Sequence, residues 1–247
     1  MANEQPGMGE QALDKVAEAG ISSQLDEVED VHVDIRTNPL KVMQGEVDSV
    51  DIDGKGMVMQ KDLRVQEMKM HTDNVGVNPM SVAFGKIELN HATDADTRVV
   101  LTEQDINRAF NSDFIGDKLK NLDVQVQGEP KTIDTQRVEF HLPGEGKIAL
   151  SADVQLRETQ ETKRVSFNAV PRIGDGGQRV VLENVQYTEG EGLSPELTDA
   201  LLEKASELLD LRNFELEGMA LRFKGLEAQS GQLTLQAQAH IEQFPSE

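Results

Sequence analysis

Alternation of apolar and polar residues runs through most of the chain and predicts a protein built mainly from β-strands. Val31, Val33 and Ile35 point one way and the residues between them are polar, as in a strand with one buried and one wet face. Further strand-like runs cover about 57–71, 82–90, 122–128, 136–142, 147–157, 162–170, 179–187 and the two strands between 214 and 244. One buried face per strand is typical of antiparallel sheets, so we expect antiparallel pairing.

Helical spacing of apolar residues interrupts the strands at three places. The first stripe covers residues 9–25. Thr102 is a candidate N-cap, and Asp105 completes a capping box with it. Ser194 followed by Pro195 marks the clearest helix start, because proline is favoured at the first helical position. Each helix therefore has one apolar side to bury.

An internal repeat relates two parts of the chain, about 101–157 and 193–244. Each unit begins with a helix of the same length, followed by an alternating strand, a glycine and one long alternating strand. The long strands match best, with 148–156 corresponding to 233–241. Neither a helix nor a strand can hide its apolar side alone, so we expect each helix to lie in the concave face of a twisted sheet.

These patterns predict an α+β fold. We expect an elongated molecule in which one long, curved antiparallel sheet wraps around amphipathic helices. No low-complexity linker divides the chain. Residues 1–8 are expected to form a flexible tail and residues 9–247 a single domain.

A set of apolar residues on the helices and long strands is expected to face the space between helix and sheet. They are Ile106, Phe110, Leu150, Ala152, Val154, Leu197, Leu201, Ala205, Leu208, Leu233, Leu235 and Ala237. Alanine leaves space that leucine would fill, and the nine methionines of the chain are adaptable, so these residues could line a tunnel. The alternative is that alanine lets helix and sheet approach closely and no void remains, since protein interiors pack densely.

Three basic residues recur at equivalent helix ends: Lys118, Lys120 and Arg212. They could meet a lipid phosphate at the mouth of a tunnel. The alternative is that cations in a last helical turn complement the helix dipole, which contributes about 0.3–1 kcal/mol each.

The charge balance of the chain limits which classes of partner it can bind. The chain has 24 basic and 45 acidic residues and a formal net charge of −21. Such a chain repels phosphate backbones and anionic bilayers at long range, so we expect no nucleic-acid partner. The N-terminal residues lack the basic and apolar regions of a signal peptide, and no apolar stretch is long enough to span a membrane. We expect a cytoplasmic protein unless an export signal was removed, and a peripheral, transient contact with a membrane stays open.

Residue chemistry gives no support for an enzyme. The chain has no cysteine, and its five histidines (32, 71, 91, 141 and 240) lack metal-ligand spacing. Residues 49–54 are similar to the start of a calcium loop, but Gln60 stands where such a loop needs glutamate. Residues 174–177 lack the following helix of a phosphate-binding loop, and no nucleophile elbow exists. We expect no catalytic residue, metal or cofactor.

Three stretches carry a resemblance to a known family: Leu101–Asn107, Gly144–Leu150 and Leu193–Leu197. With the alternating C-terminal strands, they look like the LmeA-like bacterial phospholipid-binding family. The resemblance covers nearly the whole chain from about Gly9. It implies a fold similar to tubular lipid-binding modules, with a long helix wrapped by a curved antiparallel sheet, and an activity of holding the acyl chain of a phospholipid. It transfers no fixed set of binding residues, and the chain departs from the family in lacking an export signal or lipid anchor.

The sequence therefore predicts a non-enzymatic protein that binds or carries a phospholipid or other acyl-chain lipid in an apolar tunnel. The alternative is a protein-interaction or scaffold module with a solid core. A hydrolase acting on lipid or glycan has no support in the sequence.

Overall fold

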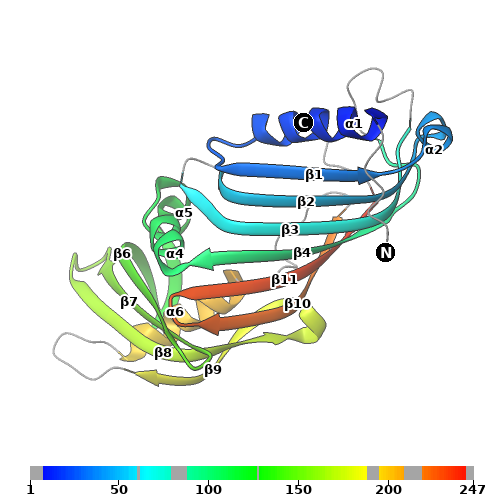
Figure 1. The fold of residues 1–247 in the computed structure, drawn as a ribbon. Helices are drawn as coiled ribbons and strands as arrows, with labels where there is room; N and C mark the ends of the chain where they lie inside the picture. The colour runs from blue at the N-terminus through cyan, green and yellow to red at the C-terminus, as the bar shows by residue number, and fades with distance from the viewer. Residues whose placement is uncertain are drawn as a thin grey trace.

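Two antiparallel sheets and a small number of helices form the protein (Figure 1). The structure is a computed structural model that describes residues 8–59, 62–78, 88–126, 128–187, 195–208 and 219–242. The strands are β1 (Asp30–Arg36), β2 (Glu46–Met59), β3 (Leu63–Gly76), β4 (Thr93–Thr102), β5 (Leu122–Val126), β6 (Glu129–Gly144), β7 (Lys147–Leu156), β8 (Thr162–Gly174), β9 (Arg179–Tyr187), β10 (Met219–Gln229) and β11 (Gln232–Ile241). The helices are α1 (Met8–Ser23), α2 (Pro39–Gln44), α4 (Glu103–Phe110), α5 (Asp113–Lys118), α6 (Pro195–Leu208) and the 3₁₀ turn η1 (Asp175–Gly177).

The α+β class and the antiparallel pairing are confirmed, but the strands form two sheets rather than the single long sheet we expected. The six-stranded sheet has the order β1-β2-β3-β4-β11-β10, and the five-stranded sheet the order β5-β6-β7-β8-β9. The C-terminal hairpin returns to the first sheet, where Leu233 lies opposite Leu101 and Ile241 opposite Thr93. The two best-matched strands of the repeat, β7 and β11, therefore lie in different sheets.

The predicted capping box at Thr102 and Asp105 is present. The helix it begins is shorter than expected, because a second cap interrupts it. Ser112 accepts a hydrogen bond from the backbone N–H of Ile115 and starts α5 as a separate helix. The other predicted cap, Ser194, lies outside the described residues, and α6 is described from Pro195. Residues 1–7 of the predicted tail also lie outside them.

Helix α1 covers the outer edge of the six-stranded sheet. The carboxylate of Asp14 accepts a hydrogen bond from the backbone N–H of Ile35 at 2.9 Å, and that of Glu18 accepts from Val33 at 3.1 Å. Residues four apart share one side of a helix, so the two carboxylates follow β1 like the acceptors of a neighbouring strand. An edge that is covered in this way cannot pair with another chain.

Helix α4 covers part of the edge of β6 by the same means. The short strand β5 pairs with β6 only as far as Ile133, and α4 lies along β6 beyond that point, where no strand of the sheet pairs with it on that side. Its contacts come from Glu103, Asn107 and Asn111, which are four residues apart. The side chain of Asn107 accepts from the backbone N–H of Phe140 at 2.8 Å and donates to the carbonyl oxygen of the same residue at 2.7 Å. Asn111 makes the equivalent pair of bonds to Val138 at 3.2 and 2.8 Å. Polar helix side chains thus stand in for the missing neighbour of β6.

The start of α4 also joins the two sheets. Glu103 accepts a hydrogen bond from the backbone N–H of Leu142, in β6, at 2.7 Å. Its own backbone N–H donates at 3.0 Å to the carbonyl oxygen of Gly231, in the β10–β11 turn. Gly231 in turn donates at 2.9 Å to the carbonyl oxygen of Leu142. This three-residue junction fixes the hairpin of one sheet against a strand of the other.

Candidate functional site

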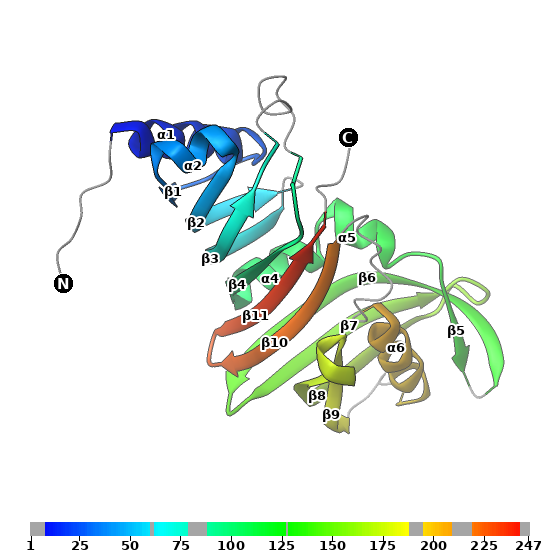
Figure 2. The same cartoon turned by 90° about the vertical axis from the view of Figure 1, so that its right-hand side faces the viewer.

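Most of the predicted tunnel-lining residues come together between α6 and the five-stranded sheet. Figure 2 shows α6 in the hollow of this sheet, and its contacts are with β5, β8 and β9. One apolar cluster includes Phe110, Leu150, Ala152, Val154, Leu197 and Leu201. An adjoining cluster includes Ile106, Phe110, Leu150 and Leu233.

The described centre of this region is well buried. Val154 has no exposed surface and Leu197 is 2% exposed, while Ala152 and Ala200 are each 5% exposed. The two cavities described below lie elsewhere in the molecule. The two alanines lie among these buried side chains. A tunnel at this position stays a prediction.

The other predicted lining residues lie apart from these clusters. Ala205 is half-buried on α6, and Leu208 is the last residue of that helix, with a side chain outside the described set. Leu235 and Ala237 are half-buried on β11, in the six-stranded sheet. Leu235 and Ala237 belong to a second apolar surface of the protein.

The six-stranded sheet carries this surface, which we call the inner face. Its side chains can be followed by strand register. Met70 pairs with Thr97, which pairs with Ala237, and in the adjacent row Met68 pairs with Val99, which pairs with Leu235. Directly paired residues point to the same face of a sheet, so these residues form two parallel rows. All six are half-buried.

Helices of the described chain pack against the six-stranded sheet chiefly at its margins. Helix α1 lies along β1, and α4 contacts β3 and β4 beyond the two rows. At that end Arg64 of β3 is bonded to Asp105 of α4 at 3.0 Å and to Glu29 at 2.7 Å. The inner face therefore differs from the five-stranded sheet, whose apolar side is filled by α6.

Sequence reasoning missed most of the inner face. Met68, Met70, Thr97 and Val99 were not among the predicted lining residues. The signal that could have found them is the period-two pattern of their strands, which places each on the same side as the other apolar residues of that strand. What the pattern does not give is that β4 lies between β3 and β11 and pairs with both, so that it joins Met68 and Met70 to Leu235 and Ala237 in one surface.

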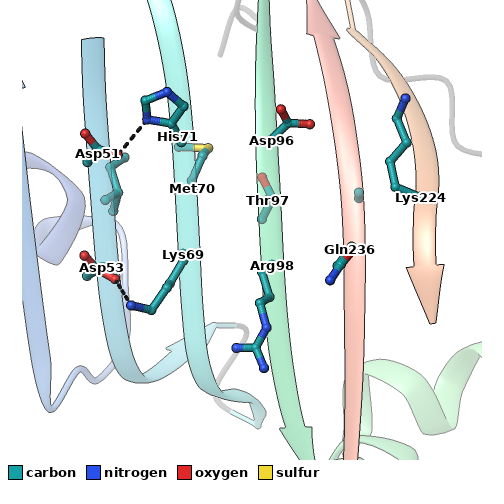
Figure 3. Close-up of a pocket in the computed structure, with 12 residues that line it drawn as sticks. Asp51, Asp53, Lys69, Met70, His71, Asp96, Thr97, Arg98, Lys224 and Gln236 are labelled. Atoms are coloured by element: carbon teal, nitrogen blue, oxygen red, sulfur yellow. Dashed lines mark hydrogen bonds and ion pairs between the residues drawn. The ribbon is translucent and has the colours of Figure 1, made fainter. Parts of the chain in front are cut away.

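The opposite, outer face of the same sheet is polar (Figure 3). Two rows of charged residues run across neighbouring strands: Asp53–Lys69–Arg98 and Asp51–His71–Asp96. A shallow cavity of about 460 Å³ lies between them. Lys69 is bonded to Asp53 at 3.0 Å, and hydrogen bonds to Asp51 and then Asp73 raise the pKa of His71. Charges of both signs neutralise one another here, as on a solvated sheet face.

A second cavity, of about 610 Å³, lies beside the start of α4. Its two arginines are already held by carboxylates: Arg64 by Asp105, which is 4% exposed, and Arg108 by Asp62 at 3.0 Å. Near it, a hydrogen bond from the backbone N–H of Leu142 lowers the pKa of Glu103. Paired charges of this kind stabilise the junction between the sheets rather than select a ligand.

Two of the predicted headgroup contacts, Lys118 and Lys120, do not line either cavity. The ammonium of Lys118 lies 4.4 Å from the centre of the Phe114 ring. Lys120 is bonded to Asp117 at 2.8 Å, which raises the pKa of the lysine. Arg212 lies outside the described residues. A role for these three residues at a headgroup stays a prediction.

Comparison with known proteins assigns the chain to a family. A family model described as LmeA-like phospholipid-binding matches residues 6–238, nearly the whole chain. This chain belongs to the LmeA-like phospholipid-binding family. The resemblance drawn from the residues around Leu101, Gly144 and Leu193 is thereby confirmed. A search of the curated proteins and a search of the solved structures gave no match.

Two further observations bear on how this LmeA-like chain acts. No helix within the described ranges has the length and apolar character needed to cross a bilayer. The same ranges contain no group of three or more His, Cys, Asp or Glu side chains placed to hold a metal ion.

Proposed function

We propose that this LmeA-like protein binds a phospholipid, or another lipid with an acyl chain, without catalysing a reaction. The family match carries the proposal. The half-buried inner face supports it, because it offers two parallel rows of apolar side chains across β3, β4 and β11. Burying an acyl chain contributes about 0.8 kcal/mol per methylene. Ten methylenes would supply roughly 8 kcal/mol before the cost of ordering the chain, which is enough for useful affinity.

The proposed position of the acyl chain is the inner face, between the margins held by α1 and α4. There the lipid would complete the burial of Met68, Met70, Val99, Leu235 and Ala237. The burial of Val154 and Leu197 beside α6 supports this choice, because a lipid there would have to displace side chains that have almost no exposed surface. A cytoplasmic location and a carrier role, as opposed to storage or sensing, remain part of the proposal.

Lipid binding itself is tested on the purified protein. Native mass spectrometry followed by organic extraction should reveal a bound lipid, and a fluorescent fatty acid should be taken up. The absence of both would refute the function and favour the alternative of an interaction module with a solid core.

The position of the lipid is tested by paired variants on one strand. Ala237→Trp would fill the inner face, whereas Gln238→Trp places the same side chain on the outer face one residue later. We expect Ala237→Trp to weaken fatty-acid uptake about tenfold or more, because the indole ring would take the place of several methylenes of the lipid on the inner face. Gln238→Trp should bind like the parent. Equal uptake by both variants would move the lipid away from the inner face and leave the function standing.

A further inference from the structure

Apolar side chains gather on the short helix α2. Leu40 is 72% exposed, Met43 is 80% exposed and Val42 is 39% exposed. The described part of the chain has four other large apolar residues with such exposure, and they lie on four other elements or turns. Leu40, Val42 and Met43 thus form a local group of exposed apolar side chains on one short helix. Single exposed apolar residues are normal on a protein surface, but a group of three is not.

The structure holds this helix firmly, so the exposure does not come from a loose loop. The side chain of Asn38 accepts hydrogen bonds from the backbone N–H groups of Leu40 and Lys41 and so caps the start. Gly45, with φ of 75°, ends the helix in the left-handed conformation, and its carbonyl oxygen accepts from the backbone N–H of Val77 at 2.7 Å. The exposed side chains are therefore presented on a fixed support.

Helix α2 itself carries little charge, although the carboxylates of Glu46 and Asp48 follow it. The net charge of the chain is −21, yet the six residues of α2 include no carboxylate. Their one charged side chain, Lys41, is bonded to Asp48. An acidic body repels anionic partners, but the neutral, apolar tip can approach a zwitterionic surface without that repulsion.

The position of α2 links it to the proposed lipid site. The helix lies at one end of the six-stranded sheet (Figure 1), and β2 begins at Glu46, directly after Gly45. A lipid that left a bilayer beside α2 would reach the end of the inner face without crossing the polar outer face.

We propose that Leu40, Val42 and Met43 form a docking tip that inserts into the interface of a zwitterionic bilayer. Three side chains give weak and reversible attachment, which suits a protein that must leave the membrane again. This proposal rests on the proposed function for its purpose, but the tip can be tested apart from lipid uptake.

The test is co-flotation of the full chain with phosphatidylcholine vesicles. The double variant Leu40→Ser, Met43→Ser removes most of the exposed apolar surface of the tip. Val16→Ser is the matched control, because Val16 is also 72% exposed but lies on α1. We expect the double variant to lose vesicle binding about tenfold or more and the control to bind like the parent. Vesicles that also contain phosphatidylglycerol should bind the parent less well at low salt.

Two results would refute the proposal that α2 docks on the bilayer. The first is that the double variant floats with vesicles as well as the parent does. If the double variant unfolds, the same result for the single Leu40→Ser variant would refute the proposal. The other is an equal loss in Val16→Ser, which would indicate general stickiness. Uptake of monomeric fluorescent fatty acid, measured without vesicles, should be the same in all variants. If neither the parent nor any variant takes up fatty acid, the proposed function is refuted. The flotation experiment still tests separately whether α2 binds the bilayer.

Discussion

Replacing Asn107 by alanine should test how strongly helix α4 holds the edge of β6. The asparagine makes three hydrogen bonds. It accepts from the backbone N–H of Phe140 at 2.8 Å, and its amide donates to the carbonyl oxygens of Phe140 at 2.7 Å and Glu103 at 2.9 Å. Asn107 is half-buried and Phe140 is buried. The variant therefore leaves both backbone groups of Phe140 on that edge without their protein partners.

The magnitude follows from those bonds. A neutral hydrogen bond contributes about 0.5–1.5 kcal/mol net, and a buried group left unsatisfied costs about 1–3 kcal/mol. Partial access of water to the half-buried site reduces the second figure. We expect Asn107→Ala to lower the free energy of unfolding by about 2–4 kcal/mol. Asn111→Ala, which removes the equivalent pair of bonds from an exposed side chain, should cost about 1 kcal/mol because water replaces it.

Urea unfolding followed by circular dichroism gives both free energies, and hydrogen exchange at the Phe140 amide reports the edge directly. The exchange rate of that amide should rise in Asn107→Ala more than the global loss of stability explains. A loss below about 0.5 kcal/mol, or equal losses in the two variants, would refute the view that α4 acts as a substitute strand.

Four other variants test separate parts of the fold. The pKa of Glu103 is lowered in the folded protein, so its carboxylate stabilises the fold above the unfolded pKa of about 4.3, and this contribution is lost as pH falls through the folded value. Glu103→Gln should therefore be less stable than the parent near neutral pH, and the difference in the free energy of unfolding by urea should shrink as the pH is lowered. Gly177→Ala should cost about 2–4 kcal/mol in thermal unfolding, because φ is 99° and a Cβ would lie 2.4 Å from a backbone oxygen of β10. Gly146→Ala, with φ of 72° and open space around it, should cost only about 1 kcal/mol. Glu18→Ala uncovers the β1 edge and should increase self-association in sedimentation or light scattering; a chain that stays as monodisperse as the parent would contradict edge protection by α1.

Local patterns in the sequence predicted local structure well. The alternation around Val33 predicted β1, and the capping residues Thr102 and Asp105 predicted the start of α4, because both depend on residues a few positions apart. The repeat predicted one helix from Thr102 to about Asn121, with Phe114 on its apolar stripe if the helix continued through residues 111–113. It does not continue, because Ser112 caps a new helix. A stripe indicates which side of a helix is buried but gives no information on a break in its backbone.

The division into two sheets could not be read from the chain, because strand pairing is non-local. A period of two tells which side chains share a face, and the similar long strands β7 and β11 gave no reason to assign them to different sheets. The β-bulge in β10 is a different case. Leu221 and Phe223 face inward with odd numbers, and Leu226 and Ala228 with even numbers, so the change of phase at the bulge beside Lys224 was visible in the sequence.

The return of β11 and β10 to the first sheet has a consequence for synthesis. Strand β4 stays without its second neighbour until residues beyond 230 have been made, and β11 must find it across more than half the length of the chain. Contacts of such sequence separation form late and slowly. On a ribosome-bound nascent chain the inner face would thus stay incomplete until the last strands have left the exit tunnel.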